Sequence, residues 1–330
     1  MSAFDGGGGN CLEAPDRPSA TASADWLSRL DVWRTSLGRL GPTTYDKVSS
    51  GGLVRESFRS GLERILSADT TLRLSPRPAA VHSARVATRR LRSSLRTFRP
   101  LLQAEWLLPI REELGWLAAL LGAVRDLDVL QDSVETLAAQ LEGGERAMLG
   151  VLVEELSGRR QVAQAELGLA LSSERYFNLV SSLFDALSVL PLLPGASRTG
   201  RRLAADLVEP SWRRLVRRVS SLPNSPDDRA LHELRIRAKE LRYACEAVAP
   251  VAPPPARELG RRAKELQSVL GRHHDAVVLR GYLRQVASRS WQHGYAGGLC
   301  LVLSLRQDDV ESWRRSWSAL EKDRLSSWLG

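Results

Sequence analysis

Two parts of the chain carry the same pattern about 150 residues apart. Residues 81–92 align with residues 231–242, so that a His, an Arg, a further basic residue, a Leu and a final Arg recur at the same places. Residues 121–126 align in turn with residues 270–275, at an offset of 149. Two matches in the same order and at nearly the same offset are hard to obtain by chance. We therefore predict two similar halves that follow one another, joined near residues 190–199.

The residue types favour helices over strands. Only three Ile occur among the 330 residues, whereas Leu, Ala and Arg, which are strong helix formers, are abundant. From residue 53 onward the apolar residues recur with helical spacing, and the sequence predicts an all-α fold. The expected helices cover residues 53–68, 79–99, 103–123, 126–141, 145–171 and 174–188, and then 200–220, 227–248, 256–272, 275–289, 292–308 and 311–326.

The predicted organisation has four parts. Residues 1–50 are poor in apolar side chains and include a run of four Gly, so we expect a mostly disordered tail with a short helix near 24–40. The first helical half then covers 51–190, a Pro- and Gly-containing linker covers 191–199, and the second half covers 200–330.

Charge and cysteine content narrow the function classes. The 47 basic residues exceed the 38 acidic ones, and 43 of the 47 are Arg, a bias that a GC-rich genome also produces. The three Cys are odd in number and widely spaced, which argues against a disulfide scaffold or a zinc site. We find neither a signal peptide nor an apolar run that could span a membrane, and we expect a cytoplasmic protein.

A one-sided basic stripe is the strongest functional signal. On a helix with 100° per residue, residues 81–99 place one His and four Arg within a narrow stripe, and this segment holds six Arg and no acid. A solvated helix face is the usual explanation of a charged stripe, but such a face normally mixes signs. The stripe therefore indicates that an anion is bound. The residues of this stripe are His82, Arg85, Arg89, Arg92 and Arg96.

The second half repeats the stripe in a less basic form. Its members are His232, Arg235, Lys239 and Arg242, with Glu233 and Glu240 beside them. Successive stripe residues lie about 4.5–6 Å apart along the helix axis. An Arg guanidinium can hold phosphate oxygens in pairs. This spacing suits a linear polyanion better than a single phosphate, although the sequence does not show whether the two stripes meet.

The repeated motifs resemble the conserved histidine α-helical domain (CHAD) family. The resemblance rests on His-x-x-Arg-x-x-x-Arg-Arg-Leu-Arg at 82–92, Leu-Gly-x-x-Arg-Asp at 121–126, and their counterparts in the second half, and it covers about residues 50–330. It implies two four-helix bundles related by a pseudo-twofold axis, and binding of inorganic polyphosphate, often at polyphosphate granules. The triphosphatase-like domain of many members is not expected in the first fifty residues.

The resemblance also implies which side chains bind polyphosphate. Carried over by position, they are His82, Arg85, Arg89, Arg92, His232, Arg235, Lys239 and Arg242. We add Arg96 from the first stripe, and Lys264 and His274 from the following helices of the second half. Arg90 lies on an adjacent face and its counterpart is Glu240, so its role is left open. We expect no catalytic residue, no metal and no cofactor, and the oligomeric state is left open.

Two other functions compete with polyphosphate binding. Nucleic-acid binding is compatible with the charge, but the nine Trp do not interleave with the stripe. Metal-dependent hydrolysis of phosphoanhydrides is suggested by His273, His274 and Asp275, but the matching residues of the first half include Arg125 where a His ligand would be needed. We instead expect Asp126 and Asp275 to hold helix junctions, by capping or by pairing with Arg.

Overall fold

The computed structural model describes residues 28, 32–35, 37, 49–194, 200–288, 298, 312–322 and 327–329. Within these ranges every regular element is a helix, apart from an isolated antiparallel bridge between Leu102 and Leu192. The predicted all-α fold is confirmed. Most of the predicted tail, the end of the predicted linker and nearly all of the predicted helix at 292–308 lie outside the described residues.

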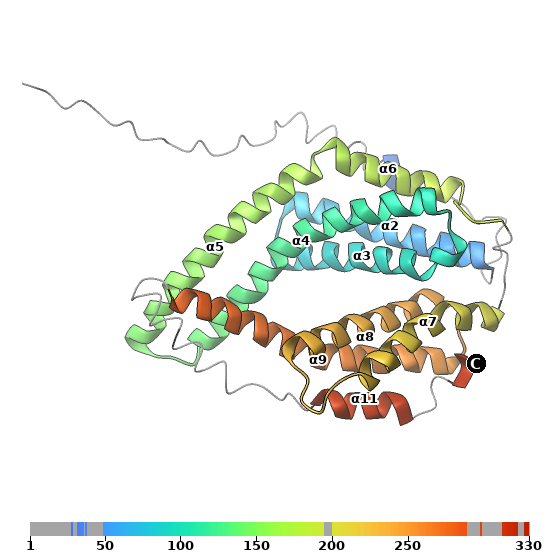
Figure 1. Cartoon of the computed structure of the whole chain (residues 1–330). Coiled ribbons are helices and arrows are strands. Elements are labelled where there is room, and N and C mark those ends of the chain that lie inside the picture. Colours follow the sequence, from blue (N-terminus) through green and yellow to red (C-terminus); the bar gives the residue numbers. More distant parts are fainter. Residues whose placement is uncertain are drawn as a thin grey trace, which may run out of the picture.

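The first half contains five long helices (Figure 1). They are α2 (Ser50–Leu74), α3 (Pro78–Thr97), α4 (Ala104–Ala138), α5 (Gly143–Leu171) and α6 (Glu174–Ser188), with the short helix η1 (Arg99–Leu101) after α3. Helix α3 packs against both α2 and α4, and α6 packs across α2 and α4. The Ser49 hydroxyl accepts a hydrogen bond from Gly52 N and thereby caps α2.

The second half packs α8 between two partners (Figure 1). Its elements are α7 (Gly200–Ser220), α8 (Asp228–Val248), α9 (Pro254–Ala287), α11 (Ser312–Lys322) and the short helix η3 (Ser327–Leu329). Helix α8 packs against α7 and α9, and α11 packs against α9. The Asp227 side chain accepts a hydrogen bond from Ala230 N (2.7 Å) and thereby caps the start of α8.

Helices α4 and α9 are longer than the sequence predicted. We expected breaks near 124–125 and 273–274, but both helices run through these positions. Each expected break follows a Gly, and a single Gly costs a helix only about 1 kcal/mol, which packing readily offsets. Asp126 and Asp275 therefore lie inside helices, and their predicted role at helix junctions was wrong. The alternative role, pairing with Arg, does hold for Asp126, which lies 3.6 Å from Arg85.

Helix α3 shows why the stripe faces away from the core. Its buried side chains recur every three or four residues, which gives the helix one apolar face. The basic residues occupy the remaining circumference. The buried set is Ala80, Val81, Ala84, Ala87, Thr88, Leu91 and Leu95.

One apolar core extends through both halves. It includes Leu62 and Leu91 of the first half together with Leu234 and Leu266 of the second. A smaller apolar cluster joins the far ends of α4, α5 and α9. Helices α3 and α8 pack directly against each other where the halves meet (Figure 1). The twofold relation of the complete halves stays a prediction, but the two helices that carry the stripes are in contact.

None of the described helices combines the length and apolar character that a membrane span would need.

Candidate functional site

The two basic stripes meet at the contact of α3 with α8. The Cζ atom of Arg89 on α3 lies 5.5 Å from the centroid of the Tyr243 ring, and that of Arg242 on α8 lies 5.1 Å from the same centroid. Two cations from different halves thus share one aromatic ring. We call the five basic residues at this contact the central cluster. Its members are Arg85, Arg89, Arg235, Lys239 and Arg242.

The charges of the central cluster act on one another. Burial, together with the nearby charges of Arg235, Arg89, Arg85 and Arg242, lowers the pKa of Lys239 to about 8. Burial likewise lowers the pKa of Arg89, with a smaller contribution from its cationic neighbours. The fold therefore holds several cations close together and partly away from water, which is costly unless an anion compensates.

Acidic side chains compensate only part of this charge. Asp126 Oδ1 lies 3.6 Å from Arg85 Nη2, and Glu246 Oε1 accepts a hydrogen bond from Arg242 Nε (2.7 Å).

Burial lowers the pKa of Arg235, and the negative charge of Asp275 offsets part of this effect by raising that pKa. By contrast, none of the described ion pairs includes Arg89 or Lys239, and Arg89 Nε is buried without a hydrogen-bond partner. These two residues occupy the same position in the two repeats and are the uncompensated centre of the cluster.

A glycine of each repeat lies next to a cluster arginine, and in the first half the glycine is needed to make room for it. A Cβ atom added at Gly122 of α4 would lie 2.6 Å from Arg85 Nη1, so only a Gly allows this arginine its observed position. In the second half, a Cβ at Gly271 of α9 would lie 3.7 Å from Arg235 Nε, which is an ordinary contact. The Leu-Gly pair of the repeat thus lies beneath the cluster arginines. The sequence showed the repeat but did not reveal this role.

The histidines are close to the cluster but carry little charge at neutral pH. His232 Nδ1 lies 3.1 Å from His274 Nδ1, so that one ring donates a hydrogen bond and the other accepts it. Burial lowers the pKa of His274 to about 4, helped by Arg235 and by His232 itself. Burial also lowers the pKa values of His232 and His82, again with neighbouring cations contributing. The structure thus places His274 beside His232, as a hydrogen-bonding group that is neutral at pH 7.

Three predicted site residues lie at the edge of the cluster or beyond it. Arg92 is exposed and lies beside Gly115 of α4. Lys264 is also exposed. It lies three residues before Gln267, whose side chain accepts a hydrogen bond from Arg242 Nη1 (3.1 Å). Arg96 instead forms an ion pair with Glu240. Among the described contacts none joins Arg96 or Lys264 to the central cluster.

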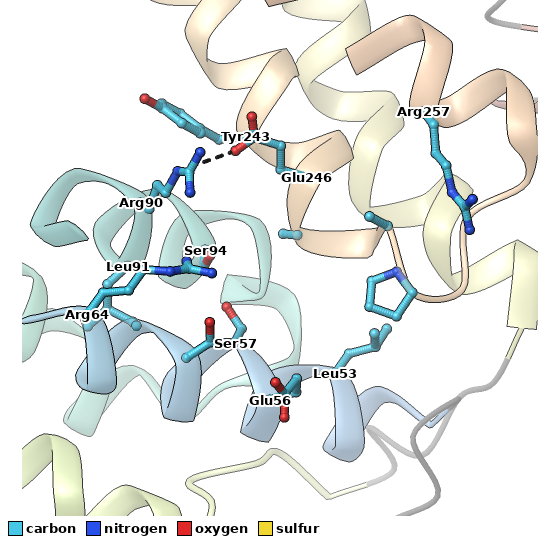
Figure 2. Close-up of a pocket in the computed structure, with 15 residues that line it drawn as sticks. Leu53, Glu56, Ser57, Arg64, Arg90, Leu91, Ser94, Tyr243, Glu246 and Arg257 are labelled. Atoms are coloured by element: carbon cyan, nitrogen blue, oxygen red, sulfur yellow. Dashed lines mark ion pairs between the residues drawn. The ribbon is translucent and has the colours of Figure 1, made fainter. Parts of the chain in front are cut away.

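Two ion pairs across the α3–α8 contact join equivalent positions of the two repeats. Arg90 Nε lies 3.7 Å from Glu246 Oε2 (Figure 2), and Arg96 Nη1 pairs with Glu240 Oε1. At the offset of 150, position 90 corresponds to 240 and position 96 to 246. The two pairs are thus the same contact seen from each half with the charges reversed, as a local twofold axis would produce. This contact gives Arg90 the role that the sequence left open.

The sequence of residues 56–284 matches the CHAD domain family. The chain belongs to the CHAD family.

Relatives extend this assignment without adding a function. Two uncharacterized proteins of Mycobacterium tuberculosis are each 32% identical over 248 residues, covering 71% of this CHAD chain and 45% of each relative. The chain thus spans less than half the length of these curated relatives.

Two solved structures resemble the CHAD chain as well. PptA from Streptomyces chartreusis is 25% identical, with a TM-score of 0.64 over 82% of this chain and 98% of that one. The CHAD domain from the plant Ricinus communis shows the same fold, at 23% identity with a TM-score of 0.66 over 84% and 95% of the two chains.

The His-His-Asp segment of this CHAD chain does not gather its side chains. His273 Nε2 contacts Asp228 Oδ1 (2.9 Å), whereas His274 faces His232. Across the residues that the structure describes, no group of three or more His, Cys, Asp or Glu could hold a metal ion.

Asp126 and Asp128, two residues apart on α4, do not form a joint carboxylate site either. Asp128 is buried and accepts a hydrogen bond from Arg160 Nε (2.6 Å), while the Asp126 side chain is 68% exposed.

Proposed function

We propose that this chain binds inorganic polyphosphate at the central cluster, without catalysis. The observation that supports the proposal most strongly is the pair Arg89 and Lys239, two partly buried cations that form no ion pair with a described carboxylate and whose pKa values are lowered by burial. An anion placed there would restore the missing negative charge. The CHAD family is linked to polyphosphate binding, and such binding would hold the chain at polyphosphate granules in the cytoplasm.

A linear phosphate polymer fits the arrangement because the cluster is extended. Arg85, Arg89 and Arg92 follow one another along α3, at axial intervals of about 4.5–6 Å. Arg235, Lys239 and Arg242 do the same along α8. A polymer with one negative charge per phosphate can contact many of these groups for a single loss of translational freedom.

The aromatic side chains favour polyphosphate over a nucleic acid. The ring of Tyr243 is already contacted by two guanidinium groups. Trp106 stacks on Phe58, and Trp212 stacks on Trp317, so these rings serve packing within the helical halves. Bases would need open aromatic surfaces, whereas polyphosphate needs only cations.

The acids near the cluster support binding without hydrolysis. Asp126 pairs with Arg85 and Glu246 pairs with Arg242. Each of these carboxylates balances the charge of a cluster arginine, a role that needs no proton transfer.

Two assays test the proposal. In a competition assay, long-chain polyphosphate should displace a bound DNA duplex at equal phosphate concentration, and DNA should displace polyphosphate poorly. Incubation with polyphosphate and a divalent metal ion should release no phosphate above the rate without protein. Preferential retention of DNA would favour the nucleic-acid function, and steady phosphate release would favour the hydrolase.

A further inference from the structure

A basic pocket lies beside the central cluster, where α3 and α8 meet α7. It has a volume of about 410 Å³ and is bordered by α3, η1, α4, α7 and α8. Five arginines line it, together with Glu240 and Asp206. We call it the arginine pocket, and its arginines are Arg96, Arg99, Arg111, Arg214 and Arg237.

One nearly buried carboxylate organises three of these arginines. The side chain of Glu240 is only 9% exposed. It pairs with Arg237 Nη1 (3.0 Å), with Arg214 Nε (3.4 Å) and with Arg96. A single negative charge thus fixes three guanidinium groups around the pocket, and it cannot neutralise them all.

The other two arginines add positive charge that Glu240 does not reach. Arg111 Nε is buried and has no hydrogen-bond partner. Burial lowers the pKa of Arg111, and the charges of Arg96, Arg92 and Arg99 lower it further. A buried, unpartnered donor beside like charges is unfavourable in the unoccupied protein, and it points to an anionic ligand.

We propose that the arginine pocket is a second phosphate site, distinct from the central cluster, for a compact anion that carries two or more phosphate groups. The volume lies within the range of small-molecule sites, and guanidinium groups bind phosphate oxygens in pairs. The anion is either a free short polyphosphate or the end of a long chain. Only the chain-end source rests on the proposed function, because the rest of the long chain would then lie on the stripe that carries Arg89. Arg92 belongs to that stripe, and its charge also acts on Arg111 of the pocket.

The pocket between α2, α3 and α8 offers a matched control. It is larger, about 610 Å³, and is lined by Arg64 and Arg257 (Figure 2). Its third arginine, Arg90, is already paired with Glu246, and Glu56 also lines it. Removing Arg64 and Arg257 therefore takes away two positive charges, as Arg99→Ala/Arg111→Ala does, but from a pocket whose basic and acidic residues are more nearly equal in number.

The first test measures tripolyphosphate binding by isothermal titration calorimetry. The wild-type chain should bind two molecules. The double variant Arg99→Ala/Arg111→Ala should lose one of them, with at least about a tenfold loss of affinity at that site. Arg64→Ala/Arg257→Ala should bind as the wild type does. If Arg99→Ala/Arg111→Ala matches the control in stoichiometry and affinity, the arginine pocket is not a phosphate site.

Further variants distinguish a loss of binding from a loss of folding, a free anion from a chain end, and the second site from the proposed function. Arg99→Gln/Arg111→Gln keeps polar side chains of similar reach, and it should show the same loss while retaining the wild-type thermal transition.

Variants of both sites are then titrated with long-chain polyphosphate. If the pocket holds a chain end, Arg99→Ala/Arg111→Ala weakens the long polymer several-fold, and if it holds a free anion, only tripolyphosphate is affected. Should Arg89→Ala/Lys239→Ala bind the long polymer normally while the pocket variant still loses one tripolyphosphate, the proposed function fails and the second site stands.

Discussion

The Cζ atom of Arg89 lies 5.5 Å from the centroid of the Tyr243 ring, and this contact joins a helix of the first half to a helix of the second. Arg242 contacts the same ring from within α8. The aromatic ring thus supports two cations that would otherwise repel each other. Tyr243 therefore belongs to the site although it is not a basic residue, because its ring contacts both arginines.

Replacement of Tyr243 separates the role of its ring from that of its hydroxyl. The hydroxyl is buried without a hydrogen-bond partner, so Tyr243→Phe should leave polyphosphate affinity and thermal stability unchanged. Tyr243→Leu removes the ring and should weaken polyphosphate binding about three- to tenfold, which corresponds to a lost cation–π contact. Fluorescence anisotropy with labelled polyphosphate measures both. Equal binding by the two variants would show that the ring does not position the arginines.

Lys239→Met should change stability and binding in opposite directions. The variant keeps the apolar stem and removes a partly buried charge whose neighbours are cations, so the free energy of unfolding should rise by about 1 kcal/mol. Polyphosphate affinity should fall at least tenfold. Chemical denaturation and binding titration give the two values.

Arg229→Met is the control, since Arg229 lies on the same helix but pairs with Glu233, outside both the central cluster and the arginine pocket. Its binding at the central cluster should be unchanged. A Lys239→Met protein that is less stable than the wild type and binds normally would remove Lys239 from the site.

The histidine pair predicts a pH dependence of stability. An unfolded His takes up a proton near pH 6.5, whereas His274 in the folded chain does so near 4. Between these values the unfolded state binds more protons, so the free energy of unfolding should fall as pH falls from 6.5 towards 4. Because the ring keeps some contact with solvent, this group should contribute less than about 1 kcal/mol per pH unit.

Thermal unfolding of wild type and His274→Gln from pH 7 to pH 4 tests this sign. The variant should lose stability less steeply than the wild type over this range. Bound polyphosphate should also reduce the loss, because a polyanion favours the protonated His. An unchanged slope in His274→Gln would contradict the shift.

The two glycines beneath the cluster should respond differently to the same change. Gly122→Ala places a Cβ atom 2.6 Å from Arg85 Nη1, so the flexible guanidinium must move and polyphosphate affinity should fall several-fold. Gly271→Ala meets Arg235 Nε only at 3.7 Å, so it should bind normally. It should also gain up to about 1 kcal/mol of stability from the better helix propensity of Ala. Indistinguishable binding by the two variants would show that the position of Arg85 does not matter.

The sequence predicted the helical class, because this follows from periodicity and from residue types, whereas the binding role of the stripe residues and of His274 stays a prediction. The sequence did not predict the continuity of α4 and α9, since a Gly before a polar segment resembles a helix end until the packing partner is known. Helix α4 continues through Gly122, and the guanidinium of Arg85 fills the space that a side chain at this position would occupy.

Contacts between distant segments were the other limit. The stripe rule placed Arg96 with Arg89 because both lie on one face of α3. In the folded chain Arg96 turns to Glu240, which lies on the other half. Tyr243, although adjacent to Arg242 in sequence, gains its role only from the approach of Arg89 across the α3–α8 contact. Periodicity within one helix does not contain this information.

Salt dependence of polyphosphate binding tests the central claim most directly. The affinity of the wild-type chain and of Arg89→Ala/Lys239→Ala for long-chain polyphosphate and for pyrophosphate would be measured across a series of salt concentrations. A chain of phosphates on the cluster releases many counterions, so wild type should show a steep dependence for the long polymer and a shallow one for pyrophosphate. The double variant should bind the long polymer at least tenfold more weakly, with the slope reduced by about 1 for each lost contact. Equal affinity and equal slope in wild type and the double variant, or pyrophosphate binding as tight as that of the polymer, would contradict an extended polyphosphate site at the α3–α8 contact.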